Sequence, residues 1–136
     1  MIDTSTFLGH WYAFIRIFRK LNMSSIKSLS ALFQAMGSTS RLQILLAIGE
    51  ADPCVCHLEA TFHWRQAYLS QHLMALRKAG ILVASRDGRN VHYRLSDPRL
   101  LNLIRQAAGL QGVDLPKMAP SPTCNCPSCN NEKEPA

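Results

Sequence analysis

The most constraining feature of this sequence is a run of leucines that recurs at helical spacing and stops at a glycine. The three leucines are Leu69, Leu73 and Leu76. Their intervals of four and three residues follow one face of a helix, and Gly80 is a typical C-terminal stop. We therefore expect a helix over about residues 65–79, with its leucines turned toward a core.

A shorter helix is expected just before it. Asp52 has the side chain of an N-cap, Pro53 presets the first helical dihedral, and the helix runs to about Thr61. A turn over residues 62–64 then leads into the longer helix. A short helix, a tight turn and a longer helix are the layout of a helix-turn-helix.

Strand patterns follow Gly80. Residues 81–86 (ILVASR) and 90–95 (NVHYRL) read as two strands, and the pair Asp87 and Gly88 between them is a turn signal. This hairpin would be the wing of a winged helix-turn-helix. We therefore predict a mainly α fold with a small β-hairpin wing (α+β).

Further helices are expected on both sides of this motif. Apolar residues from Ile26 recur at helical spacing up to Gly37, and Ser38 or Thr39 can cap a next helix that ends at Gly49. After the hairpin, Ser96 or Asp97 can cap a last helix, with Pro98 near its first position. Its apolar face consists of Leu100, Leu101, Ile104, Ala107 and Ala108. A helix face with this many apolar residues needs another apolar surface to pack against.

The length and composition set the domain organisation. With 136 residues, 47% of them hydrophobic, the chain is long enough for one domain plus a flexible end. We divide it into an N-terminal amphipathic extension (1–22), the winged helix-turn-helix domain (23–112) and a flexible cysteine-rich tail (113–136). Met23 is a second plausible start, so the role of the extension stays open.

The basic residues are concentrated rather than spread. Between His63 and Arg94, six Lys or Arg residues stand against one acid, Asp87, so a net +5 of the chain's formal +6 lies there. That footprint predicts a nucleic-acid partner. A membrane surface is the rival partner, and only residues 7–21 could serve it, with a spacing that suits a helix pairing seam equally well. No apolar run approaches the roughly 18 residues of a membrane span, so we expect a cytoplasmic protein with reduced thiols.

All five cysteines fall into two clusters. Cys54 and Cys56 form a CVC pair before the helix-turn-helix, and the tail carries Cys124, Cys126 and Cys129. Thiolates bind soft cations and trivalent metalloids well, although a lone buried cysteine is usually just a small hydrophobe. On an ideal helix the Cys54 and Cys56 side chains would diverge by roughly 200 degrees. We therefore expect that one ion reaches both only if the first turn is distorted, which would couple ion binding to the helix that follows.

Four stretches together resemble a known family. LFQAMGSTSRLQILLAI, CVCHL, LSQHLMALRKAGIL and DGRNVHYRL, in that order, are similar to the arsenic- and metal-responsive ArsR/SmtB repressors, over about Leu29 to Ile104. The resemblance implies a winged-helix homodimer that binds double-stranded operator DNA and dissociates from it when a toxic ion binds. The apolar first and last helices fit such a dimer.

The residues expected to contact DNA lie on the longer helix and the wing. Gln66, Ser70 and Gln71 lie away from the leucine face and can enter a major groove, where Gln can pair with adenine. The family motif extends to His72, which the resemblance adds as a contact, and Arg77 belongs to the same basic region. Arg86 and Arg89 flank the hairpin turn, where a wing meets phosphate or the minor groove. The competing interpretation is a solvated helix face.

The inducer is expected to be a soft ion held by thiolates. Arsenite or antimonite would want three thiolates and lead or cadmium three or four, so the Cys54 and Cys56 pair falls short. The tail cysteines, from the same or the other subunit, could complete the set. Alternatively they bind a separate ion or form an oxidation-prone tail. His57 stands where many members have an acidic residue, and Arg99 stands where the family's other site has His, so zinc or cobalt sensing at the last helix is not expected.

Three functions are compatible with these observations. The leading one is a transcriptional repressor released by As(III), Sb(III), Cd(II) or Pb(II). A second keeps the DNA contacts but makes the cysteines a redox switch. A third is a metal carrier or thiol-disulfide protein that uses the tail. An enzyme is not expected, because the sequence has no Gly-rich phosphate loop and no CxxC at a strand-to-helix junction.

Overall fold

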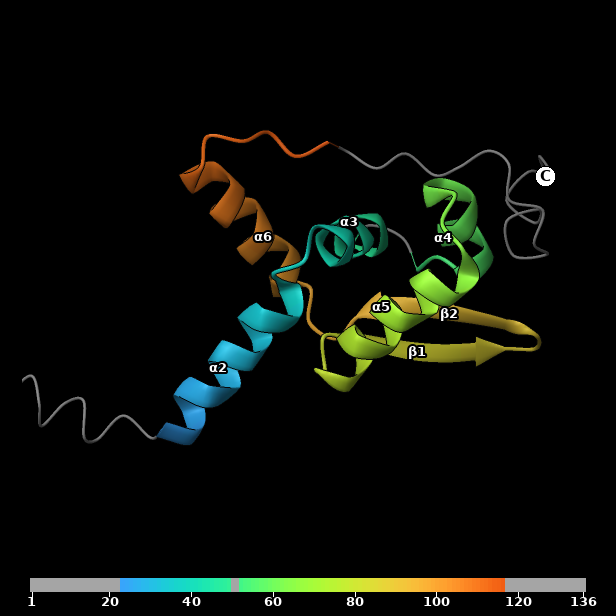
Figure 1. Ribbon diagram of the computed structural model, residues 1–136, viewed down its shortest axis with the longest axis horizontal. Coiled ribbons are helices and arrows are strands. Elements are labelled where there is room, and N and C mark those ends of the chain that lie inside the picture. Colours follow the sequence, from blue (N-terminus) through green and yellow to red (C-terminus); the bar gives the residue numbers. More distant parts are fainter. Residues whose placement is uncertain (1–22, 50–51, 117–136) are drawn as a thin grey trace, which may run out of the picture. The chain divides into compact units, whose positions relative to one another are not determined.

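Four helices, a two-stranded hairpin and a last helix follow one another along the residues that the structure describes, which are 23–49 and 52–116 of a computed structural model (Figure 1). The elements in chain order are α2 (Met23–Met36), α3 (Thr39–Ile48), α4 (Val55–Phe62), α5 (Gln66–Lys78), β1 (Leu82–Asp87), β2 (Asn90–Leu95) and α6 (Arg99–Leu110). The chain divides into two compact parts, Met1–Phe33 and Gln34–Ala136. The mainly α fold with a hairpin wing, predicted from the sequence, is confirmed.

The core of the second part forms around the leucine face of α5. Leu69, Leu73 and Leu76 are at most 1% exposed, as the sequence pattern predicted. Further fully buried side chains come from α3, α4 and the start of the hairpin, among them Ile44, Leu45, Ile48, Leu58 and Ile81. Burying each such side chain contributes roughly 1.5–3 kcal/mol, so the core fixes α5 by its inner face and leaves its outer face to solvent.

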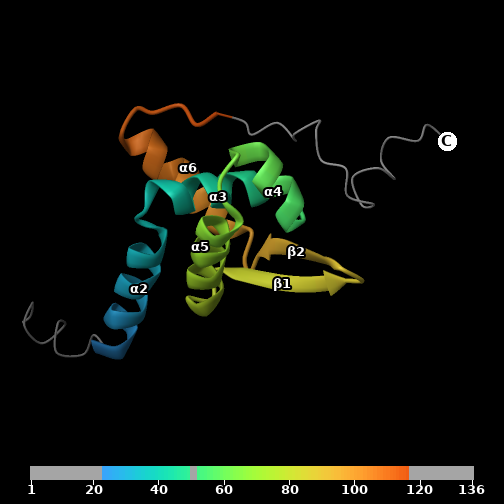
Figure 2. The ribbon, with the colours of Figure 1, turned by 45° about the vertical axis from the view of Figure 1, so that its right-hand side comes forward.

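The hairpin packs on this core through its base. β1 and β2 pair antiparallel, from Leu82 opposite Leu95 at the base to Asp87 opposite Asn90 at the tip. The loop is Gly88 and Arg89, one residue later than expected, and Gly88 has a φ of 58°, which glycine adopts without strain. α5 lies beside β1, while α3 and α4 contact β2 (Figure 2).

The start of α4 differs from the sequence prediction. Asp52 and Pro53 were expected to begin this helix, but it begins at Val55, and Cys54 is the N-cap, with extended backbone at φ −77° and ψ 163°. The prediction was wrong because the segment is held by tertiary contacts. Pro53 accepts a hydrogen bond from the Tyr93 amide in β2 (3.1 Å), so its backbone follows the strand and not the helix.

The other helix boundaries are close to their predictions. Ser38 is the N-cap of α3, without a side-chain hydrogen bond. Asp97 accepts a hydrogen bond from the Arg99 amide (2.9 Å) at the start of α6. His63 ends α4 in the left-handed conformation, with a φ of 55°. Within the described part of the chain, no helix combines the length and the apolar character that crossing a bilayer requires.

Candidate nucleic-acid interface and thiol pair

The outer face of α5 carries the polar residues that the sequence singled out. Gln66, Ser70, Gln71 and Arg77 are all exposed, on a helix whose three leucines face the core. Helical spacing places Ser70, Gln71, Arg77 and Lys78 along one outer stripe, since Arg77 follows Ser70 and Lys78 follows Gln71 by seven residues, which is about two helical turns. A surface of amide, hydroxyl and cationic groups on a rigid helix offers donors to both base edges and phosphates.

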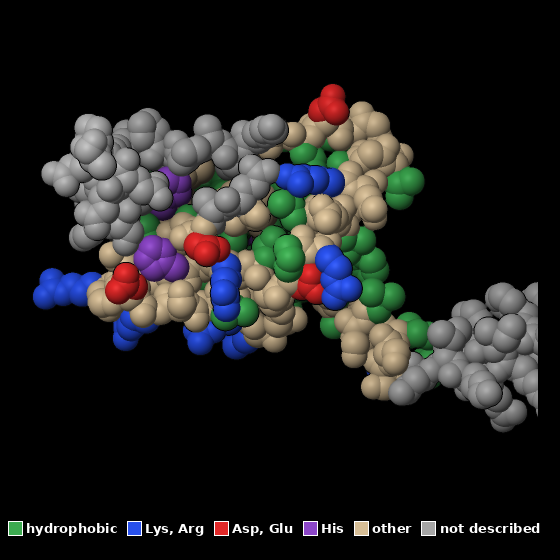
Figure 3. All heavy atoms as spheres, turned by 180° about the vertical axis from the view of Figure 1, so that it is seen from behind, with side chains coloured by type: hydrophobic (Ala, Val, Ile, Leu, Met, Phe, Trp, Pro, Cys, Tyr) green, Lys and Arg blue, Asp and Glu red, His purple; other side chains and the backbone are tan. Residues whose placement is uncertain are grey.

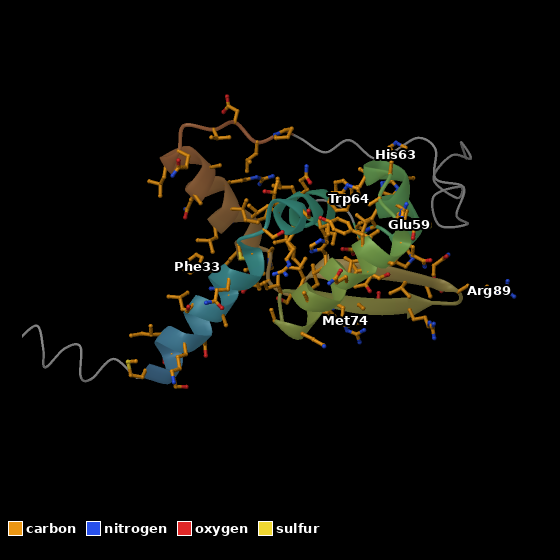
Figure 4. The ribbon with its side chains drawn as sticks, viewed as in Figure 1. Phe33, Glu59, His63, Trp64, Met74 and Arg89 are labelled. Atoms are coloured by element: carbon orange, nitrogen blue, oxygen red, sulfur yellow. The ribbon has the colours of Figure 1, made fainter. Side chains whose placement is uncertain are left out.

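One large apolar side chain lies within this stripe. Met74 is 56% exposed and projects from α5 (Figure 4). It was not among the contact residues expected from the sequence, because methionine in a helix usually reads as core. The sequence did contain one sign that Met74 is exposed, because its spacing from the three leucines places it on the opposite face of the helix.

His72 lies away from the outer stripe. Both of its ring nitrogens are buried and have no hydrogen-bond partner among the described residues. The ring meets the edge of Tyr68, with centroids 4.5 Å apart and an interplanar angle of 79°. Burial, and to a smaller extent the charge of Arg41, lower the pKa of His72 below its ordinary value of 6.5. In this arrangement the ring of His72 is a packing group of α5.

Aromatic rings join the turn to α5. Phe62 and Trp64 stack with centroids 4.5 Å apart, and Trp64 meets the edge of Tyr68 at 5.3 Å. The Tyr68 hydroxyl also shares a hydrogen bond with the Ser40 hydroxyl in α3 (2.7 Å). These contacts fix the angle at which α5 leaves the turn. Sequence reasoning missed them, because aromatic residues in two helices and in the turn between them do not reveal which rings meet.

The wing adds cationic side chains. Arg86, Arg89 and Arg94 are exposed on the hairpin, and Arg89 reaches out at its tip (Figure 4). Seen from behind, Lys and Arg side chains gather along the edge formed by the hairpin and α5 (Figure 3). Clustering of this kind raises the local positive potential, which attracts a polyanion.

The thiols of the CVC pair lie together. The Cys54 and Cys56 Sγ atoms are 2.7 Å apart, within hydrogen-bonding distance of each other. Cys54 is 2% exposed and packs with Cys56 and Ala60. The divergence expected for an ideal helix does not occur, because Cys54 precedes the helix in extended conformation. The distortion that a shared ion was expected to require is therefore already present.

The same segment is tied to the wing. In addition to the Tyr93–Pro53 hydrogen bond, the His92 Nδ1 atom lies 3.0 Å from the Asp52 carbonyl oxygen. Cys54 and His92 also form an isolated antiparallel bridge. The first thiol of the pair thus stands beside β2, the strand that leads from the hairpin tip back to the core.

The described residues supply only part of an ion site. No group of three His, Cys, Asp or Glu residues that could hold a metal ion occurs within 23–49 and 52–116. The three tail cysteines lie outside the described residues. At the start of α6, Arg99 forms an ion pair with Asp97 (2.7 Å), and its hydrogen bonds lower the pKa of that carboxyl. Among the described residues, two sulfur atoms therefore lie together at the start of α4, fewer than the three groups of a candidate metal site.

Known proteins resemble this chain over the region just described. Residues 38–83 match the family described as bacterial regulatory protein, arsR family. The chain is 36% identical over 83 residues to the HTH-type transcriptional repressor SmtB of Mycobacterium tuberculosis, covering 61% of this chain and 62% of that protein. It is 39% identical over 66 residues to the arsenical resistance operon repressor of Escherichia coli, covering 48% and 56%. It is 31% identical over 86 residues to the cadmium resistance transcriptional regulatory protein CadC of Listeria innocua, covering 62% and 72%. The chain thus spans less than two thirds of the length of SmtB.

Solved structures share the fold. The transcriptional regulator HlyU from Vibrio vulnificus superposes with a TM-score of 0.58 and 29% identity, over 68% of this chain and 96% of that one. A homodimeric winged helix-turn-helix DNA-binding domain from Mycobacterium bovis gives a TM-score of 0.63 at 19% identity, over 68% and 86%. The second likeness concerns the fold only. Together they confirm the winged helix-turn-helix architecture.

Proposed function

Because this chain belongs to the ArsR family of bacterial regulatory proteins, we propose that it is a DNA-binding transcriptional repressor that a soft metal or metalloid ion releases from its operator. The observation that carries this proposal is the convergence of the Cys54 and Cys56 thiols, 2.7 Å apart, at the start of a helix-turn-helix. Sulfur ligands select soft ions, and their position beside the DNA-contact elements gives the ion a means to act.

The DNA contacts are assigned to the outer stripe of α5 and to the wing. Gln66, Ser70 and Gln71 supply groups for base edges, and the cations supply phosphate contacts, from Arg77, Arg86 and Arg89. In the unbound chain the ring nitrogens of His72 are buried. A contact of His72 with DNA therefore requires its side chain to turn outward.

The inducer is assigned to the thiophilic class. Two thiolates favour As(III), Sb(III), Cd(II) or Pb(II) over harder ions, and these ions want at least three soft ligands. Relatives with named functions include an arsenical and a cadmium resistance regulator. We assign the missing ligands to Cys124, Cys126 and Cys129.

We propose that ion binding weakens the DNA contact through the wing as well as through α4. Because Cys54 is already outside the helix, drawing both sulfurs onto one ion moves the segment 52–54 and need not unwind α4. That segment is bonded to β2 at Pro53 and Asp52. A shift there reorients the strand that carries Arg94 and leads to the tip. Coupling free energies of about 1–3 kcal/mol weaken binding about 5- to 150-fold, enough for derepression.

The central experiment measures DNA release by each ion. The full chain, anaerobic and with reductant, binds a fluorescent duplex selected from a random-sequence library, and arsenite, antimonite, Cd(II), Pb(II) and Zn(II) are added in turn. We expect at least one soft ion to lower the DNA affinity about 5- to 150-fold, measured by anisotropy. The Cys56→Ser variant should keep its DNA affinity and lose the response. Cys56 is the better first target because it is only partly buried, whereas Cys54 is in the core.

Other outcomes select other functions. If only an oxidant releases the DNA, the cysteines act as a redox switch and not as an ion sensor. If the chain selects no duplex, the proposed DNA-binding function is contradicted. A variant with serine at all three tail cysteines tests the missing ligands. If it responds with the same ion affinity as the parent chain, the tail does not belong to the site.

A second experiment tests the coupling through the wing. His92→Phe removes the Nδ1 group near the Asp52 carbonyl oxygen, while His92→Asn keeps a nitrogen donor near that position. We expect His92→Phe to bind the ion with unchanged affinity in the absence of DNA but to show a reduced ion-induced fall in DNA affinity. His92→Asn should recover most of the parent chain's response. Equal release by the parent chain and both variants would contradict a role for this contact.

A further inference from the structure

We propose that Met74 is a specificity-determining contact that recognises the 5-methyl group of a thymine in the operator. The proposal rests on the proposed function, since it requires α5 to enter the major groove. It adds a large apolar side chain to a surface on which polar and cationic groups predominate.

The position of Met74 places it within the outer stripe of α5. Ser70 and Gln71 are one helical turn before it, at four and three residues, and Arg77 and Lys78 are one turn after it, at three and four. Residues at these intervals are neighbours on a helix surface. A ligand that contacts the amide of Gln71 and the cation of Lys78 therefore also covers Met74.

The chemistry of the side chain limits what it can contact. Met74 is 56% exposed in the unbound chain, so its burial contributes little to the fold. Arg77 and Lys78 beside it oppose an apolar protein partner and favour a polyanion. Within DNA, the phosphates and the polar base edges offer a thioether no strong contact. The thymine methyl is the apolar group of the major groove, and an unbranched methionine can adapt its shape to reach it.

The experiment compares thymine recognition by the parent chain and by Met74→Ala. Duplexes are selected from a random-sequence library with each protein, and thymines preferred only by the parent chain are noted. Each such thymine is then replaced by deoxyuridine, which lacks only the methyl group. We expect the replacement to weaken binding by the parent chain about fourfold, the value of one buried carbon. Met74→Ala should bind the thymine and deoxyuridine duplexes equally.

The matched control is Val83→Ala. Val83 is also an exposed apolar residue (39%), but it lies at the base of β1, away from the hairpin tip. This variant should keep the thymine preference of the parent chain. Thermal unfolding of each variant checks that it is folded.

The charge variant Met74→Lys gives a second readout. An additional cation in the stripe should strengthen binding to any duplex and steepen its salt dependence by about 0.9 for each further phosphate that is neutralised, while the response to deoxyuridine disappears. If Met74→Ala selects the same thymines and retains the same deoxyuridine response as the parent chain, the inference is overturned and the repressor function stands. If the parent chain selects no duplex, both the thymine contact of Met74 and the proposed repressor function are contradicted.

Discussion

At the scale of single residues, Gly49 is the described glycine at which an added side chain would meet the closest neighbours. A Cβ atom at this position would lie 2.8 and 2.9 Å from the two methyl groups of Leu101 in α6, and 3.2 Å from the Leu45 carbonyl oxygen. Gly49 has an ordinary helical φ of −58°, so the reason for glycine here is space and not backbone conformation. The end of α3 and the start of α6 meet at this point.

Gly49→Ala tests this packing. We expect the free energy of unfolding to fall by about 1–3 kcal/mol, because Leu101 must leave its place in a buried contact. Urea denaturation followed by circular dichroism, at one protein concentration, measures the change.

Gly109→Ala is the matched control within α6. No heavy atom lies within 4 Å of the added Cβ, and Gly109 has no positive φ. Alanine should therefore raise the free energy of unfolding by about 0.5–1 kcal/mol, the helix preference of alanine over glycine. A loss of stability in the control equal to that of Gly49→Ala would show that the close contact is not the cause.

At the scale of elements, the wing is a paired two-stranded hairpin with exposed cations near its tip. Its base is held by Leu82, which is 2% exposed, while Arg86 and Arg89 stand in solvent near the tip. Exposed cations such as these contribute little to folding. Their expected contribution is to phosphate binding.

The wing prediction concerns salt. Replacing Arg86 or Arg89 by glutamine should lower the slope of log affinity against log salt concentration by about 0.9 for each phosphate that is no longer neutralised. The preferred sequence should be unchanged, since phosphates carry no base identity. Titrations of one duplex at four salt concentrations measure the slope. The control is Lys27→Gln, which removes an exposed cation on α2 and should leave the slope unaltered. If the slope is also unaltered in the wing variants, the wing does not contact phosphates.

At the scale of the whole molecule, exposed apolar side chains point to a second copy of the chain. On α2, Ile26, Leu29 and Phe33 follow helical spacing and are 36%, 52% and 51% exposed. Such a continuous apolar stripe is typical of a helix that pairs with a partner. We propose that α2 contributes to a homodimer.

The dimer prediction is tested by charge. Leu29→Glu or Phe33→Glu should shift the chain from dimer to monomer in sedimentation velocity, because a buried unpaired carboxylate opposes association. Ala31→Glu puts the same group on the opposite face of α2 and should leave the dimer intact. A monomeric parent chain at micromolar concentration would contradict the proposal.

Much of this molecule follows from local patterns in its sequence. The leucine face of α5, the hairpin and the basic window could be predicted because helix period, strand alternation and charge are properties of neighbouring residues. The winged helix-turn-helix prediction followed from their order. The assignment of Gln66, Ser70 and Gln71 to an exposed face needed only the position of the leucines, and their contact with DNA stays a prediction.

Tertiary structure decided the features that join distant residues. The sequence placed Cys54 in the first turn of a helix, yet the bond between His92 and Asp52, 40 residues apart, and the Tyr93–Pro53 bond accompany an extended segment there. The surroundings of the His72 ring likewise include Trp64, which lies outside its own helix. Local propensity is a weak preference that a few long-range hydrogen bonds and buried contacts can override. The sequence by itself therefore determined which elements form and which face of each is polar, and only the packing of those elements decided that the two thiols converge beside the wing.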